Sequence, residues 1–167
     1  DVFSDSRGSF YESFHEYKYS TSAGIRYNFV QDNFSYSTKG VLRGLHFQYK
    51  KPQGKLVRVS RGKVFDVAVD LRKQSKSFKK WFGIELSDQN NYQLWIPPGF
   101  AHGFLVLSED AHFQYKCTDF YDPADEGCIF WKDSDLGIEW PEIDDIEISK
   151  KDLEAPSFNQ IMNKFKT

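Results

Sequence analysis

The chain has 167 residues, a formal net charge of −2 and 17% aromatic residues. That length suits one domain with a real core, and the aromatic content favours a β-rich globular protein over disorder or a coiled coil. The mixed charge argues against a general nucleic-acid binder, and no apolar run approaches the ~18 residues of a membrane span. Two cysteines, Cys117 and Cys128, are too few for a disulfide framework and predict reduced core thiols in a cytoplasmic protein.

The first part of the chain alternates turns with short elements. Residues 5–8 (DSRG) predict a turn, and the aromatic residues after them predict a strand. A short helix is possible within residues 15–27, and residues 29–35 predict a strand with Gln31 and Asn33 on one face. Two amides on one face suit either a groove that binds a polar ligand or an exposed strand face, and the spacing leaves both open.

Residues 40–48 (GVLRGLHFQ) predict the strand around which the chain is organised. A glycine within such a run, here Gly44, marks a bulge or a close approach of backbones. His46 lies between apolar neighbours, so it is either a hydrogen-bonded core residue or a base shielded from bulk water. Arg43 and His46 are three positions apart and would face opposite ways in a regular strand. Both can serve one ligand only if Gly44 bulges or the strand twists sharply.

The next segment gives the clearest strand pattern in the chain. Residues 55–59 are predicted to pair with residues 64–71 through a turn at residues 60–62. Apolar side chains at the odd positions of residues 65–71 share one face, and Asp66 lies on the other face. Asp66 therefore points either into a polar cavity or into solvent.

Residues 83–87, 93–96 and 100–108 predict further strands, and residues 112–118 predict an alternating one. In that last run Tyr115 shares the expected inward face with Phe113 and Cys117. An inward tyrosine needs a partner for its hydroxyl, and a substrate can be that partner.

The C-terminal third predicts short helices. Residues 149–152 (SKKD) match a capping box with Asp152 at its third position, and Pro156 limits that helix to about one turn. A second short helix is possible up to Phe165. The whole pattern predicts an all-β antiparallel sandwich or barrel, with residues 1–167 forming one domain. The chain has no glycine-rich phosphate loop, which argues against a dinucleotide cofactor.

Six blocks of the sequence carry a family resemblance. They are residues 40–48 (GVLRGLHFQ), 53–59 (QGKLVRV), 65–70 (FDVAVD), 97–104 (PPGFAHGF), 115–121 (YKCTDFY) and 137–141 (GIEWP). In this order and spacing they resemble the dTDP-4-dehydrorhamnose 3,5-epimerase family over nearly the whole chain. Compared with the family, we expect the chain to lack an N-terminal strand before Val2.

The resemblance implies a cupin-type jelly roll that forms a homodimer and uses no cofactor. It implies epimerisation at C3 and C5 of dTDP-4-dehydro-6-deoxy-D-glucose, giving dTDP-4-dehydro-L-rhamnose for cell-surface polysaccharide synthesis. Carried over by position, it gives the catalytic residues His46 (base), Asp152 (its acidic partner), Tyr115 (acid) and Lys55 (cation at the ketone). It gives the substrate-contacting residues Asp32, Arg43, His102, Tyr121, Glu126 and Lys151. Those expected to reach the ligand from the partner subunit are Arg7, Glu12, Gln31 and Asn33.

The chemistry accounts for these residue types. A C4 carbonyl acidifies the hydrogens at C3 and C5, and a neutral imidazole can remove one of them. A lysine ammonium stabilises the resulting enolate, and a tyrosine returns a proton from the other face of the sugar. A carboxylate on the far imidazole nitrogen fixes the tautomer.

Three alternatives remain at this point. A metal-dependent cupin such as a dioxygenase needs clustered imidazoles and a carboxylate, often His-x-His followed by Glu, but Gln48 stands two residues after His46. We therefore expect no metal. A catalytically silent sugar-nucleotide binding module would keep Arg43 and Lys55 without needing His46 and Tyr115 together. A sister enzyme that epimerises only C3, or isomerises the ketone, would use the same residue types.

Overall fold

The computed structural model describes residues 1–165 as an antiparallel β structure with three short helices. In chain order the elements are β1 (Phe3–Asp5), β2 (Gly8–Phe10), α1 (Glu16–Ser22), β3 (Gln31–Thr38), β4 (Val41–Gln48), β5 (Lys55–Asp70), β6 (Trp81–Ser87), β7 (Gln93–Ile96), β8 (Phe100–Cys117), β9 (Glu126–Cys128), β10 (Glu147–Ile148), α2 (Lys150–Leu153) and α3 (Phe158–Lys164). The predicted all-β class with short C-terminal helices is confirmed.

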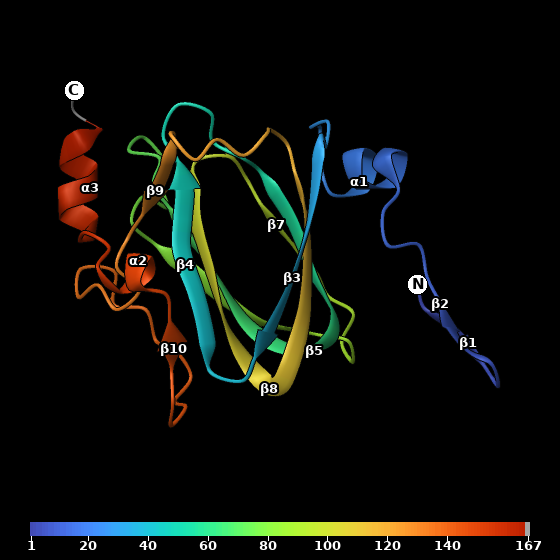
Figure 1. The fold of residues 1–167 in the computed structure, drawn as a ribbon. Coiled ribbons are helices and arrows are strands. Elements are labelled where there is room, and N and C mark those ends of the chain that lie inside the picture. The colour runs from blue at the N-terminus through green and yellow to red at the C-terminus, as the bar shows by residue number, and fades with distance from the viewer. Residues whose placement is uncertain (166–167) are drawn as a thin grey trace.

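The main sheet curves into a barrel (Figure 1). Its strand order is β10-β4-β8-β5-β6, while β3 pairs with β8, β7 with β5 and β9 with β4. All these pairs are antiparallel except β10 with β4. The helices α2 and α3 lie beside β4 and β9 at one side of the barrel (Figure 1). Among residues 1–165, no helix is long and apolar enough to cross a membrane.

The long strands β5 and β8 form the spine of the barrel, and they overturn one sequence-based prediction. Residues 55–59 and 64–71 do not form a hairpin; β5 runs through Gly62 and pairs with β8 along its whole length. Register shifts on either side of Gly62 mark a bulged segment. The backbone at Gly62 has a φ of 78°, and a Cβ there would meet the carbonyl oxygen of Asp110 at 2.0 Å. Gly62, which the sequence predicts to be part of a turn, thus forms a bend within a continuous strand.

Two apolar cores lie on opposite faces of the sheet. The interior core is built around Val57, Val64 and Phe113, whereas the exterior core packs Val67 and neighbouring residues against α3. The predicted period-two alternation of residues 64–71 is confirmed, because its two faces enter different cores. From Val64 to Asp70 both faces of β5 are therefore largely shielded from water, and a polar residue on either face there needs a partner.

The strand β4 has its irregularity at the predicted glycine. The register of β4 on β8 shifts between Arg43 and His46, and Gly44 has a φ of 115°. A Cβ on Gly44 would approach the carbonyl oxygen of His102 to 2.6 Å and the Cα of Gly103 to 2.7 Å. Only glycine fits this crossing of backbones. The question that the sequence left open is thus answered, because regular strand alternation is interrupted between Arg43 and His46.

The N-terminal hairpin stands apart from the barrel (Figure 1). Among the described strands, β1 pairs with β2 and with no other. Every residue of the two strands is exposed, including Phe3 at 63% and Phe10 at 68%. The fold of this chain therefore gives the apolar side chains of the hairpin no core to enter.

We predict that Gly44→Ala destabilises the protein by at least ~2 kcal/mol, because both the positive φ and the contact with the β8 backbone oppose a Cβ. Gly137→Ala is the matched control, because Gly137 also has a positive φ, 58°, but no heavy atom within 4 Å of the added Cβ. We expect the control to lose about 1 kcal/mol. Urea unfolding of both variants checks this, and equal losses would show that the contact with β8 does not matter.

Candidate active site

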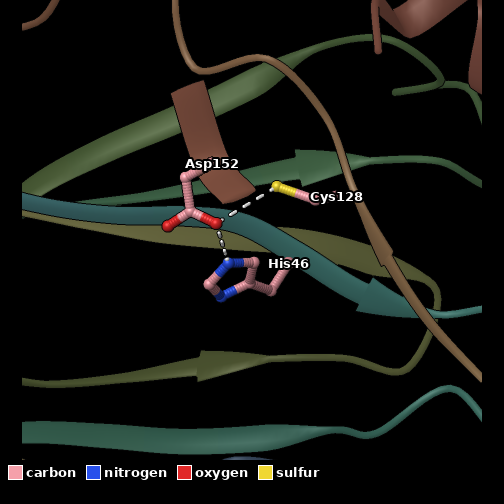
Figure 2. A group of neighbouring side chains, drawn as sticks. All are labelled: His46, Cys128 and Asp152. Carbon is pink, nitrogen blue, oxygen red and sulfur yellow. Dashed lines mark hydrogen bonds and ion pairs between the residues drawn. The ribbon is translucent and has the colours of Figure 1, made fainter. Parts of the chain in front are cut away.

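A histidine–carboxylate pair joins β4 to the C-terminal segment. His46 Nε2 lies 2.7 Å from Asp152 Oδ1, and Figure 2 shows the imidazole directed at the carboxylate. An ionised carboxylate only accepts hydrogen bonds, so Nε2 carries the proton and Nδ1 is the nitrogen left to accept one. Asp152 is buried, whereas the His46 side chain is 30% exposed.

The predicted capping box at residues 149–152 is only half formed. The Ser149 hydroxyl accepts from the Asp152 N–H at 3.1 Å, as a cap should. The Asp152 carboxylate does not return to the Ser149 backbone but binds His46 and, through Oδ2, the Gly44 N–H at 3.2 Å. The side chain of Asp152 therefore orients His46 instead of capping the N-terminus of α2.

The environment of Asp152 keeps it ionised. Burial by itself raises the pKa of Asp152, but the hydrogen bond and charge of His46, together with the Gly44 N–H, hold that pKa below its usual value. The ionised carboxylate is thus available to stabilise a protonated imidazole.

Cys128 makes the pair a cluster of three. Its Sγ lies 3.6 Å from Asp152 Oδ1, the oxygen that also binds His46 (Figure 2). The ligand atoms of the three residues lie within 4.8 Å of one another, so a metal ion has to be considered. Two ligands of a tetrahedral zinc ion stand roughly 3.3 Å apart, given bonds of about 2.0–2.1 Å. The 2.7 Å between His46 and Asp152 fits a shared proton better. Burial also raises the pKa of the Cys128 thiol, and metals bind the thiolate.

The strands β8 and β5 bring a phenol and an ammonium into the interior. Tyr115 on β8 and Lys55 on β5 face inward, with Lys55 Nζ 5.8 Å from the centre of the Tyr115 ring. Burial raises the pKa of Tyr115 to about 12, so the phenol is neutral near pH 7. Burial also lowers the pKa of Lys55, while neighbouring Cys117 and Asp66 oppose that shift.

His102 lies on β8, between β4, which carries His46, and β5, which carries Lys55. Its contact with Asp66 settles which way the Asp66 side chain points. His102 Nε2 is 2.9 Å from Asp66 Oδ2, and both side chains are buried. Asp66 therefore points into the interior rather than into solvent. Burial lowers the pKa of His102, which favours the neutral ring. The charges of Lys55 and His46 also lower the pKa of His102, so groups from β4 and β5 converge around it.

The rim of the interior holds a second polar network. Glu126 Oε2 accepts from the Tyr121 hydroxyl at 3.0 Å and forms an ion pair with Lys151. Burial raises the pKa of Glu126, but the hydrogen bonds from Lys151 and Tyr121 outweigh it and keep the pKa below its usual value. Arg43 is exposed, donates to Ser37 Oγ at 3.1 Å, and its charge opposes the rise in the pKa of Tyr115.

Gln31 and Asn33 hydrogen-bond to inner groups of this chain itself. Asn33 Nδ2 donates to Cys117 Sγ at 3.4 Å, and the Tyr121 N–H donates to Gln31 Oε1 at 2.9 Å. The two amides also bind each other at 3.0 Å. Both side chains are half-buried, so they do not form a fully exposed strand face.

Three of the expected substrate-contacting side chains are not brought to the interior in this chain. Asp32 faces the outer side of β3, where its carboxylate binds Lys116 at 3.0 Å, because strand alternation turns it away from Gln31 and Asn33. Arg7 is paired with Asp5 in the N-terminal hairpin, and Glu12 is paired with Lys18; all four are exposed.

The sequence did not single out Cys128 or Asp66 as site residues. Cys128 enters the site because β9 pairs with β4 in a register that sets it opposite His46, and nothing in the sequence specifies that register. Asp66 had a visible signal, a carboxylate in the middle of an otherwise apolar strand, but the signal was open to two interpretations.

An imidazole held by a carboxylate inside a jelly-roll barrel can transfer protons, which suits an isomerase. Comparison with known proteins identifies the family of isomerases. The family model described as dTDP-4-dehydrorhamnose 3,5-epimerase matches residues 1–160. The enzyme of that name from Salmonella typhimurium is 53% identical over 162 residues, covering 96% of this chain and 88% of that protein. The chain belongs to the dTDP-4-dehydrorhamnose 3,5-epimerase family.

Solved structures agree. A dTDP-6-deoxy-D-glucose-3,5-epimerase from Legionella pneumophila, crystallised with dTDP-4-keto-L-rhamnose, superposes with a TM-score of 0.96 at 52% identity, covering 99% of this chain and 88% of that one. A 3'-monoepimerase from Streptomyces bikiniensis, in complex with dTDP-quinovose, superposes with a TM-score of 0.91 at 31% identity, covering 98% and 83%. The same fold thus occurs in an enzyme named for one centre and in enzymes named for two.

Proposed function

We propose that this chain epimerises both C3 and C5 of dTDP-4-dehydro-6-deoxy-D-glucose without a cofactor, giving dTDP-4-dehydro-L-rhamnose. The observation that carries the proposal is the convergence, around His102, of the His46–Asp152 pair from β4 and α2 with Lys55 from β5. Tyr115 lies beside Lys55. The 52–53% identity to relatives named for this reaction supports the same substrate.

The first half of the reaction removes a proton. His46 Nδ1 takes the hydrogen from a carbon next to the C4 ketone, and the electron pair of that bond becomes the enolate, with its charge on the C4 oxygen. The Lys55 ammonium stabilises that charge, which is worth most in an interior shielded from water. Asp152 stabilises the imidazolium that results.

The second half returns a proton to the opposite face of the same carbon. The Tyr115 hydroxyl gives its proton to the carbon, the enolate collapses to the ketone, and the configuration inverts. The phenolate left behind has a conjugate acid with a pKa of about 12, so it recovers a proton readily. Solvent exchange resets His46, and the cycle repeats at the second carbon.

The remaining polar groups are assigned to binding the nucleotide sugar. We assign Gln31, Asn33, Arg43, His102, Tyr121, Glu126 and Lys151 to substrate contacts. Arg43 is the exposed cation at the rim, and a guanidinium binds a pyrophosphate with two parallel hydrogen bonds. Asp32 is left out because its carboxylate faces away.

A 3-epimerase is the second candidate, because a 3'-monoepimerase shares the fold at 31% identity. Both enzymes need the same base, acid and cation, so these residues do not show whether one carbon or two is inverted. Incorporation of solvent deuterium at C3 and C5 distinguishes the two.

We predict that the wild-type enzyme, given dTDP-4-keto-6-deoxyglucose in deuterated water, places deuterium at both C3 and C5. The returned proton comes from groups that exchange with solvent, so each inverted centre becomes labelled. His46→Ala should lose labelling and turnover together, because one base starts every cycle, and loss of a general base costs ~10²–10⁴-fold. NMR of the product resolves the two positions.

The outcomes separate the candidates. Deuterium at C3 alone identifies a 3-epimerase, and deuterium at neither carbon favours a silent binding module or another sugar. Labelling by His46→Ala at the wild-type rate excludes His46 as the base.

We predict that Tyr115→Phe still exchanges hydrogen with solvent but makes little inverted product. The phenyl ring keeps the packing of Tyr115 against Lys55 and removes only the acid. His46 would still form the enolate, which would then be reprotonated from the face it left, or by water. The ratio of solvent exchange to inversion should rise at least ~10-fold. A parallel fall in exchange and inversion would assign Tyr115 to binding instead.

We also propose a homodimer in which the N-terminal hairpin completes the partner's site. The exposed hairpin carries Arg7, whose charge is met only by nearby Asp5 among the described residues. Its two exposed phenylalanines need an apolar surface to cover them.

We predict complementation between two inactive variants. In a mixed dimer of Arg7→Ala and His46→Ala subunits, one site combines an intact His46 with the partner's intact hairpin, while the other site lacks both residues. Differently tagged subunits, purified as the heterodimer, should regain up to half of the wild-type activity per dimer. The controls are the two parental homodimers. Heterodimers that form but stay at the parental level would disprove the shared site.

A further inference from the structure

We propose that Cys128 is a positioning residue for the reaction, with its thiol donating a hydrogen bond to Asp152 Oδ1 and so fixing the carboxylate that orients His46. This inference rests on the proposed role of His46 as the base. It adds a third member, from β9, to a pair that β4 and α2 supply.

The contacts around Asp152 show what the thiol contributes. Oδ2 accepts from the Gly44 N–H at 3.2 Å, and Oδ1 accepts from His46 at 2.7 Å. With Cys128 Sγ at 3.6 Å from Oδ1, each oxygen has a donor besides the imidazole itself (Figure 2). A carboxylate held at both oxygens cannot rotate when His46 gains or loses its proton.

The thiol is in the right protonation state to donate. Burial, and then the negative charge of Asp152, raise the pKa of Cys128, so the sulfur keeps its hydrogen. Among residues 1–165, the thiol has one other acceptor, the backbone oxygen of Ile129 at 3.8 Å. The carboxylate oxygen is nearer and charged, and hydrogen bonds to charged acceptors are the stronger ones.

Strand pairing brings Cys128 to this place. Residues of β9 and β4 pair in the register His46↔Cys128, so the two side chains emerge side by side on one face. The thiol is buried, as is Asp152, and therefore no bulk water competes for the contact.

The titratable groups that face the cluster come from the neighbouring elements. They are Tyr49 directly after β4, Glu126 on β9, Lys151 on α2 and His102 on β8. A substitution at Cys128 leaves all four in place. A change in the pH dependence of catalysis would therefore report the loss of the thiol hydrogen bond.

The test compares Cys128→Ala, which removes the donor, with Cys128→Ser, which keeps one. We expect kcat to fall about three- to ten-fold in the alanine variant, the range for one hydrogen bond. The acid limb of kcat/KM should move about 0.3 to 0.5 pH units higher, because Asp152 then keeps its full charge for the imidazolium. The serine variant should stay near wild type in both measurements.

Contrary results are equally definite. An alanine variant with the wild-type rate and pH profile overturns the proposal. So do alanine and serine variants that lose activity equally with an unmoved acid limb, since that pattern belongs to packing alone. If Cys128→Ala does not fold, as judged by its thermal transition, Cys128→Val fills the space without a donor and takes its place.

Failure here is distinct from failure of the proposed function. Deuterium labelling by the wild-type enzyme and its loss in His46→Ala test the reaction and the base without involving Cys128. If those results hold and Cys128→Ala behaves as wild type, only the positioning role is disproved.

Discussion

The Asp152 carboxylate is the point at which distant parts of the chain are held together. A buried charge is costly unless it is paired and hydrogen-bonded, and the partners of Asp152 come from Gly44 and His46, more than a hundred residues earlier. Those contacts fix α2 against β4. The need to satisfy one carboxylate thus decides where the C-terminal segment docks as well as which nitrogen of His46 faces the interior.

The sequence predicts most of the fold because alternation and turn residues act locally. The pattern at residues 64–71 is confirmed in both cores, and Gly44 is an irregularity as expected. What fails is the distinction between a turn and a bulge at Gly62. Both need a glycine with a positive φ, and only the position of β8, which is not local information, separates them.

In the candidate active site, too, a local sequence pattern does not determine which distant residue a side chain contacts. The spacing of Ser149 and Asp152 is correct for a capping box, and the serine does cap the helix. The carboxylate instead binds His46 and the Gly44 N–H, two donors that only the tertiary structure brings to it. Family resemblance predicted that contact, whereas Cys128 had no signal of either kind. For Asp32, strand alternation was sufficient to predict that it lies on the opposite face of β3 from Gln31 and Asn33.

The interior core explains why the charged groups act strongly on one another. Phe113 stacks on Phe104 with ring centres 4.2 Å apart, and His102 stacks on Phe113 at 5.8 Å. These rings form an apolar layer that excludes water from one side of His102. In such surroundings the charge of an ammonium is screened far less than in water. In the reaction that we propose, Lys55 therefore acts on the enolate from a fixed position on β5, and the neutral His102 does not compete with it for negative charge.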